Sequence, residues 1–229
     1  VLALMTPAVY ADSLKAEKPF VPTSHYVKQT MEGWSVRVNK DLLNGIDKQT
    51  GTRALALLKN KLSEIRRIVP RQALAKLMQV SIWLGVDDYA IPNATYHPSR
   101  EWLQENGWNS DKARGVEISN AKIFLEWSQD QPMLVLHELS HAYHDQVLGY
   151  DNAELERCYA RAKKSGKYNR VKNISGAVVR AYALNDAHEF FAEASEAYFG
   201  KNDFQPFTRS ELKKFDLDTY RVIEKMWNR

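Results

Sequence analysis

Two histidines and a glutamate stand at a spacing that suits a metal ion. His137, Glu138 and His141 form the pattern His-Glu-x-x-His, in a segment that starts at Pro132 and has no other helix-breaking residue before Gly149. On a helix, residues four apart share one face, so both imidazoles can reach one zinc ion. Glu138 is turned about 100° from the first ligand and can accept a proton from the water that the metal activates. The pattern therefore predicts hydrolytic zinc chemistry.

The alternative to a zinc site is a buried helix with two core histidines. With 6 His and 15 Glu in 229 residues, the pattern arises by chance in about one such chain in a hundred. Two imidazoles and a carboxylate make a poor core, however, because each buried polar group needs a partner of its own. We therefore favour the zinc site.

A catalytic zinc ion needs a third protein ligand and an open position. His144 lies about 10.5 Å along the helix axis from His137, too far to share the ion, and we expect it to cap or bridge a nearby group. The extended pattern with a third histidine requires Gly at 144 and His at 147, but His144 and Val147 stand there. A carboxylate from a second helix remains as the third ligand.

Three glutamates recur at helical spacing downstream, among aromatic residues. They are Glu189, Glu193 and Glu196. Glu189 and Glu193 could supply one ligand and one acceptor for the second N–H of a ligand histidine. An exposed acidic edge would explain Glu196 well and Glu189 badly. Spacing alone leaves the choice among the three open.

The elements that must position these residues fall into two halves. Alternation predicts strands over 33–38, 80–86 and 115–119, with a surface segment over 12–32 and a loop over 87–98. Helical spacing predicts helices over 52–68, 71–78, 99–106, 132–148, 152–165, 178–199, 209–215 and 217–227. Strands first and helices last predict an α+β domain: a small mixed sheet with an N-terminal helix, then a helical half that carries the zinc site.

Composition excludes several classes of protein. The chain is 44% hydrophobic and 26% charged with a formal charge of +4, which excludes a disordered tail, a collagen-like repeat and a coiled-coil rod. The single cysteine, Cys158, excludes an intrachain disulfide and a four-cysteine zinc site. Histidines and carboxylates must therefore hold any metal.

The N-terminal residues predict export. Residues 1–11 are apolar and uncharged, and Val9 and Ala11 place small residues where a signal peptidase cuts. We interpret this stretch as the remnant of a secretory signal peptide, so that the domain spans 12–229 and is secreted or periplasmic; the alternative is an apolar arm packed on the domain. Elsewhere no apolar run is long enough for a membrane span, so we expect no stable membrane insertion.

A basic run separates the two halves of the predicted site. It comprises Arg157, Arg161, Lys163, Lys164, Lys167, Arg170 and Lys172. Binding of the phosphates of a nucleic acid is one interpretation of this run, and attraction of acidic substrates is another. We expect a solvated helix end and loop, and no nucleic-acid partner.

The motifs together resemble a known family. The sequence HELSH, followed 41 residues after His141 by Tyr182-x6-Glu-Phe-Phe-Ala-Glu193, is similar to the catalytic domain of anthrax lethal factor and its bacterial relatives, which are zinc metallopeptidases of gluzincin type. The resemblance is specific over residues 131–199 and weaker over 80–130, where Tyr96-His-Pro-Ser99 and Gly115–Asn120 are similar. It implies a zincin-like fold for a single domain.

The resemblance also implies roles for individual residues. His137, His141 and Glu189 would be the ligands of one zinc ion, and Glu138 the general base. Tyr182 would donate a hydrogen bond to the developing oxyanion. Glu193 would support one of the ligand residues without touching the metal itself. No counterpart of the toxin's receptor-binding and substrate-binding domains is seen, so its host target does not carry over.

The predicted function is zinc-dependent peptide hydrolysis. We expect an endopeptidase whose partner is a peptide or protein substrate, held along an exposed strand edge at Val116–Ser119. The alternatives are an aminopeptidase and a zinc-containing binding or assembly module without peptidase activity. Nothing in the sequence predicts the oligomeric state.

Overall fold

The structure is a computed structural model that describes residues 19–88 and 94–228. Its strands are β1 (Tyr26–Met31), β2 (Trp34–Asn39), β3 (Ile82–Leu84), β4 (Ala94–Tyr96), β5 (Val116–Ile118), β6 (Val171–Lys172) and β7 (Val178–Val179). Its helices are α2 (Lys40–Asn44), α3 (Lys48–Ile68), α4 (Arg71–Leu77), α5 (Arg100–Glu105), α6 (Ala121–Asp130), α7 (Leu134–Tyr143), α8 (Ala153–Ser165), α9 (Ala187–Phe199), α10 (Arg209–Phe215) and α11 (Leu217–Trp227). The predicted signal peptide, residues 1–11, lies outside the described residues.

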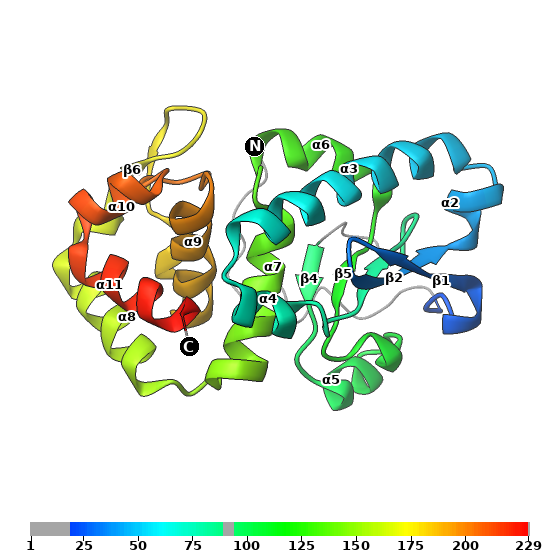
Figure 1. The fold of residues 1–229 in the computed structure, drawn as a ribbon, viewed down its shortest axis with the longest axis horizontal. Coiled ribbons are helices and arrows are strands. Elements are labelled where there is room, and N and C mark those ends of the chain that lie inside the picture. The colour runs from blue at the N-terminus through cyan, green and yellow to red at the C-terminus, as the bar shows by residue number, and fades with distance from the viewer. Residues whose placement is uncertain (1–18, 89–93, 229) are drawn as a thin grey trace.

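The α+β class and the small mixed sheet are confirmed. Figure 1 shows the sheet with α3 and α6 on one side of the molecule, the helices α8 to α11 on the other, and α7 between them. The five-stranded sheet has the order β1-β2-β3-β5-β4. The central strands β2, β3 and β5 run parallel, and β1 and β4 pair antiparallel at the two edges.

The predicted substrate-binding edge is wrong. The segment Val116–Ser119 contains β5, which is bonded to β3 on one side and to β4 on the other. Its backbone groups are therefore occupied by the sheet, and the free edge next to the helical half belongs to β4 (Ala94–Tyr96). The prediction failed because β4 lies inside the segment that we expected to be a loop.

Further elements were missed, among them helix α2, for which no helix was predicted. Strand β1 stands in the segment expected at the surface: only Tyr26 is buried in it, so the strand has almost no apolar alternation. It joins β2 through Glu32 and Gly33, whose φ values of 51° and 100° suit a tight hairpin. Helix α6 had no prediction, and the hairpin β6–β7 replaces the first residues of the helix expected over 178–199.

The sheet and the helices packed on it share the main apolar core. Along α3, Ala54, Leu58, Leu62 and Ile65 are buried at spacings of three and four, and they join the core cluster that includes the sheet residues Val36, Ile82 and Val116. None of the helices in the described part of the chain is long and apolar enough to cross a bilayer.

The two helices that carry the predicted ligands, α7 and α9, are buried on almost all sides. All but the first of the ten residues of α7 are buried, and so are ten of the thirteen residues of α9. The two helices lie side by side at the centre of the molecule (Figure 1). Polar groups on their facing sides are therefore removed from water and must find partners there.

Candidate metal centre

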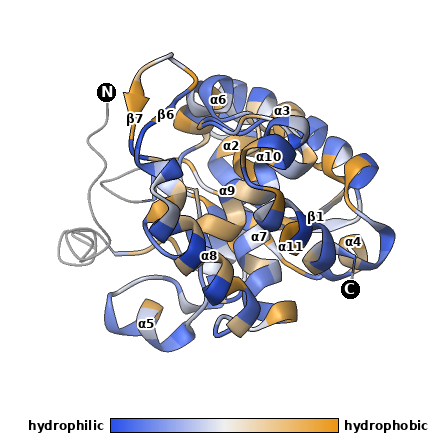
Figure 2. Cartoon of the chain, turned by 90° about the vertical axis from the view of Figure 1, so that its left-hand side faces the viewer, coloured by the Kyte–Doolittle hydropathy of each residue, from blue (hydrophilic) through white to orange (hydrophobic). Residues whose placement is uncertain are grey.

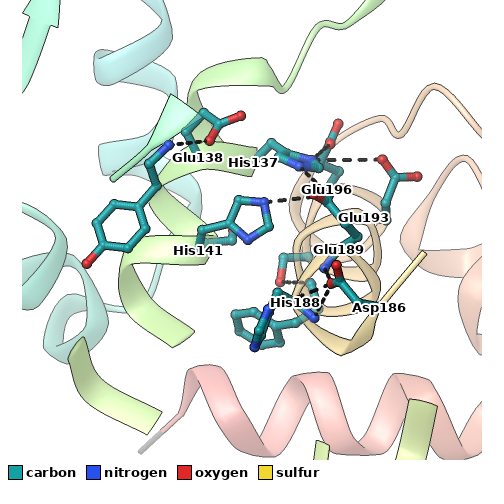
Figure 3. A network of polar contacts seen from close by, with 12 residues as sticks. His137, Glu138, His141, Asp186, His188, Glu189, Glu193 and Glu196 are labelled. Atoms are coloured by element: carbon teal, nitrogen blue, oxygen red, sulfur yellow. Dashed lines mark hydrogen bonds and ion pairs between the residues drawn. The ribbon is translucent and has the colours of Figure 1, made fainter. Parts of the chain in front are cut away.

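Three ligand atoms from the two central helices converge at one point. The Nε2 atoms of His137 and His141 lie 3.1 Å and 3.6 Å from the same carboxylate oxygen, Oε2 of Glu189. The two imidazoles are 4.8 Å apart between ring centres, and all three ligand atoms lie within 4.8 Å of one another. Figure 3 shows both rings turned toward Glu189 on α9. The structure thus brings together the three residues predicted as ligands.

The separation of these atoms fits a zinc ion. A tetrahedral zinc with bonds of about 2.0–2.1 Å holds its ligand atoms about 3.3–3.4 Å apart. The distances from Glu189 Oε2 to His137 and His141, 3.1 Å and 3.6 Å, fall on either side of that value. Two imidazole nitrogens and one carboxylate oxygen are also a donor set that zinc accepts, with a fourth position left for water.

The start of α9 fixes the position of Glu189. The side chain of Asp186 caps this helix by accepting hydrogen bonds from the backbone N–H groups of His188 and Glu189, both at 2.9 Å. The cap interrupts the helix expected over 178–199, which begins at Ala187 instead. Glu189 therefore lies in the first turn, where the helix dipole favours a carboxylate.

The acceptor behind the first ligand is Glu196 rather than Glu193. Oε1 of Glu196 lies 2.6 Å from Nδ1 of His137, whereas Oε1 of Glu193 lies at 3.8 Å. Seven residues bring a helical side chain back to within about 20° of its starting direction, and four leave it about 40° away. Glu196 therefore follows Glu189 on the face of α9 that meets His137. It is 3% exposed, so the alternative of an exposed acidic edge does not hold for Glu196.

Glu193 belongs to a buried acidic group behind the ligands. It accepts a hydrogen bond from Asn202 Nδ2 at 3.2 Å, and burial together with Asp203 and Glu196 raises its pKa well above the usual range. Burial and the neighbouring Glu196 likewise raise the pKa of Asp203 to about 7. Carboxyls that share a buried site resist ionisation unless a cation offsets their charge.

The ligands themselves carry opposite shifts. Burial alone would lower the pKa of His137, but Glu189 and Glu196 outweigh it and hold that pKa well above its usual value. Burial alone would raise the pKa of Glu189, but His141 and His137 hold it below its usual range. In the protein without metal, the protonated imidazole of His137 supplies the positive charge between these carboxylates.

Glu138 stands beside the ligand atoms and is not one of them. Its carboxylate turns toward the sheet, where Oε2 accepts a hydrogen bond of 2.8 Å from the backbone N–H of Tyr96 on β4. Figure 3 shows this contact on the side of His137 away from α9. Burial raises the pKa of Glu138, which suits a group that must take up a proton.

Two tyrosines border the cluster. Tyr182, in the turn Tyr182–Leu184 before α9, is partly buried; burial, followed by the charge of Glu189, raises its pKa, so its phenol remains protonated. Tyr150 was not predicted as a site residue. Its ring packs on that of His188 with 4.1 Å between centroids, and burial, followed by the charges of Tyr96 and Asp145, raises its pKa. Only the fold brings Tyr150 near the site, so no sequence motif marks it.

The two remaining histidines of interest lie apart from the ligand set. His144 is fully buried, and within residues 19–88 and 94–228 neither of its ring nitrogens has a hydrogen-bond partner, so it does not cap or bridge as expected. It packs against Tyr150, His188 and Phe191. Nε2 of His97 lies 2.7 Å from Glu117 in a different cluster, on the other face of the sheet.

Comparison of the chain with protein-family models, with curated proteins and with solved structures finds no match.

Proposed function

We propose that the protein is a zinc-dependent peptidase. The observation that carries this proposal is the convergence of His137 Nε2, His141 Nε2 and Glu189 Oε2 at zinc-like separations, with Glu138 beside them and free of the ligand set. A buried structural helix would need a partner for each imidazole, but it would not require both imidazoles to meet the same carboxylate oxygen. The resemblance of the motifs to lethal factor catalytic domains supports the same activity and a zincin-like fold.

The residues of the site divide the chemistry among them. A zinc ion held by His137, His141 and Glu189 would activate a water molecule and polarise the scissile carbonyl. The carboxylate of Glu138 takes a proton from the attacking water and delivers it to the leaving amine; its burial brings its pKa closer to neutrality for both tasks. The protonated phenol of Tyr182 donates a hydrogen bond to the carbonyl oxygen as negative charge develops there.

Strand β4 is the proposed place for the substrate backbone. It is an edge strand, and the N–H of Tyr96 points away from β5 toward Glu138. An extended peptide added along this edge would lie across the metal cluster, because Glu138 follows the first ligand directly. Recognition of this kind uses main-chain hydrogen bonds and suits peptide or protein substrates. Secretion or a periplasmic location remains a prediction from residues 1–11.

Peptide cleavage with controlled metal content tests the proposal. Purified protein is mixed with a peptide library in three states: as isolated, after chelation, and after zinc is restored. We expect internal cleavage that chelation abolishes and zinc restores. Peptides with blocked and free N-termini separate endopeptidase from aminopeptidase activity. Zinc-loaded protein that binds peptides and cleaves none of them would leave the binding module as the function.

A further inference from the structure

One surface of the helical half is strongly basic. From residue 157 to residue 185 the chain contains eight Lys and Arg residues and no Asp or Glu, although the whole chain has 32 basic and 28 acidic residues. The rest of the chain is therefore net acidic. This segment forms most of α8, the hairpin β6–β7 and the turn that leads to Tyr182.

Four exposed cations lie in or next to the hairpin. Together with the exposed Ile174 and Val178 they form what we call the basic hairpin patch. The cations are Lys167, Arg170, Lys172 and Arg180. Lys167 donates to the backbone oxygen of Phe215 at 3.0 Å, and Arg180 to that of Leu184. These bonds orient two of the cations without neutralising them. Among the described residues none of the four forms an ion pair, in contrast to Arg161, which pairs with Asp216 and Asp218.

The two apolar members of the patch are Ile174 and Val178, which are 36% and 54% exposed. Figure 2 shows the hairpin projecting from the body of the protein, with the apolar β7 facing solvent beside the hydrophilic β6. The hairpin base is fixed, because Val171 is buried and the N–H of Ile174 donates to the backbone oxygen of Asp203 at 2.7 Å. A firmly held hairpin thus presents aliphatic side chains between cations.

We propose that the basic hairpin patch docks on the surface of an anionic phospholipid membrane. Cations attract the anionic headgroups, while aliphatic side chains enter the boundary between headgroups and acyl chains. Charge complementarity and exposed aliphatic residues are present in the same hairpin, and both are needed for this mode of binding. The docking is peripheral and requires no membrane-spanning segment.

Nucleic acid fits the patch less well. Binding of single strands relies on aromatic side chains on which bases stack. In this segment Tyr168 is 3% exposed, and the hydroxyl of Tyr159 is tied to the backbone oxygen of Leu184 at 2.8 Å. The exposed side chains between the cations are aliphatic instead, and they gain more from an acyl boundary than from bases.

Docking would bring the candidate metal centre close to the membrane. Arg180 precedes Tyr182 by two residues, and its guanidinium bonds to Asn185 Oδ1 at 2.7 Å in the same turn. This consequence rests on the proposed function, because it assigns a catalytic role to Tyr182. The docking itself does not, so it can be tested without any peptidase assay.

Vesicle sedimentation of the full chain tests the docking. Vesicles of phosphatidylcholine alone are compared with vesicles that also contain phosphatidylglycerol, at about 0.1 M and about 0.5 M salt. We expect binding to the anionic vesicles that weakens at high salt, and little binding to the neutral ones. Equal binding to both kinds of vesicle, or to neither, would overturn the proposal.

Variants separate the two contributions. Lys167→Gln/Arg170→Gln/Lys172→Gln should weaken binding to anionic vesicles by about 100-fold, since each cation near the surface contributes about fivefold. Ile174→Ser/Val178→Ser should weaken it by about tenfold and leave the salt dependence intact. Thermal unfolding confirms that each variant is folded.

The matched control removes the same charge elsewhere. Arg53, Lys59 and Arg67 are exposed on α3, in the half that carries the sheet. Arg53→Gln/Lys59→Gln/Arg67→Gln should bind anionic vesicles like the wild type. If the control loses as much affinity as the hairpin variant, net charge rather than the patch is responsible and the proposal fails. Binding to a DNA duplex or an RNA strand without binding to vesicles would also overturn it.

Discussion

This protein has two buried clusters of charged side chains, and they differ in how their charge is balanced. The Lys112 cluster lies on the outer face of the sheet. Nζ of Lys112 is 2.9 Å from Asp88 Oδ2 and pairs with Glu117, which His97 also contacts at 2.7 Å. Lys112 and Glu117 are each no more than 1% exposed. Here the chain supplies its own cation.

The candidate metal centre is balanced differently, because without metal a protonated imidazole offsets its carboxylates. It gathers five carboxyls around two imidazoles, and among the described residues no lysine or arginine forms an ion pair with any of them. The carboxyls are those of Glu138, Glu189, Glu193, Glu196 and Asp203. Buried carboxylates are costly unless they are paired or bind a metal. The comparison teaches that burial of polar groups does not itself mark a binding site, whereas a buried group of carboxyls without a paired lysine or arginine suits a metal ion.

The largest effect is expected at the metal centre, on activity. Glu138→Gln keeps the size of the side chain but cannot accept the proton from water. We expect peptide cleavage to fall by about 10²–10⁴-fold, with zinc content unchanged because Glu138 is not a ligand. Steady-state kinetics and metal analysis of the same sample measure both. A Glu138→Gln enzyme with wild-type turnover would refute the assignment of the base.

At the Lys112 cluster the expected effect is on stability. Lys112→Met leaves Glu117 and Asp88 buried without their cation, and breaking such a pair typically costs about 3–5 kcal/mol. Denaturant unfolding should show this loss, while zinc content per chain remains that of the wild type. Lys122→Met, at an exposed position on α6, is the control and should change the free energy of unfolding by less than about 0.5 kcal/mol. Loss of zinc in Lys112→Met would mean that the two clusters are not independent.

The acceptor behind His137 gives a smaller effect. Glu196→Gln weakens the hydrogen bond to Nδ1 of this ligand, and losses of this kind typically cost about 10–100-fold in metal affinity. Glu193→Gln is the matched control, because its carboxyl lies farther from Nδ1, at 3.8 Å. Competition with a zinc chelator measures both affinities. If Glu193→Gln has the larger effect, the resemblance to the known family was the better guide to this role.

The sequence predicted the two histidine ligands because their spacing is a local property of one helix. Spacing left the third ligand open among three glutamates, and the family resemblance implied Glu189. The choice between Glu193 and Glu196 depends on how α9 is rotated against α7, and no spacing encodes that angle. The same limit explains the Lys112 cluster: Glu117 stands in a strand and Lys112 in a turn, and nothing in the sequence shows that Asp88 meets them.

The short elements were missed for a related reason. Strand β4 has three residues and owes its existence to pairing with β5, so its own pattern is too short to read. Long amphipathic helices such as α3 and α11 were predicted within a few residues, because their buried positions repeat over several turns. The error on β4 also displaced the predicted substrate edge by one strand.

The smallest effect concerns His144, which neither cluster uses. Burial lowers its pKa to about 3 from the usual 6.5. As pH falls below about 6.5, His144 binds a proton in the unfolded chain but not in the folded protein. It therefore lowers the free energy of unfolding progressively between pH 6.5 and 3. In chelator-treated protein, His144→Phe should therefore lose about 1 kcal/mol less than the wild type between pH 7 and 5.5. Identical pH dependence of the two proteins would mean that His144 is protonated in the folded state.

Zinc content per chain, measured in wild type and in Glu189→Ala, tests the central claim most directly. We predict about one zinc per wild-type chain and almost none in Glu189→Ala, with the exposed-site control Glu156→Ala retaining the wild-type content. A wild-type protein that binds no divalent metal, or a Glu189→Ala variant that holds zinc as tightly as the wild type, would contradict the account.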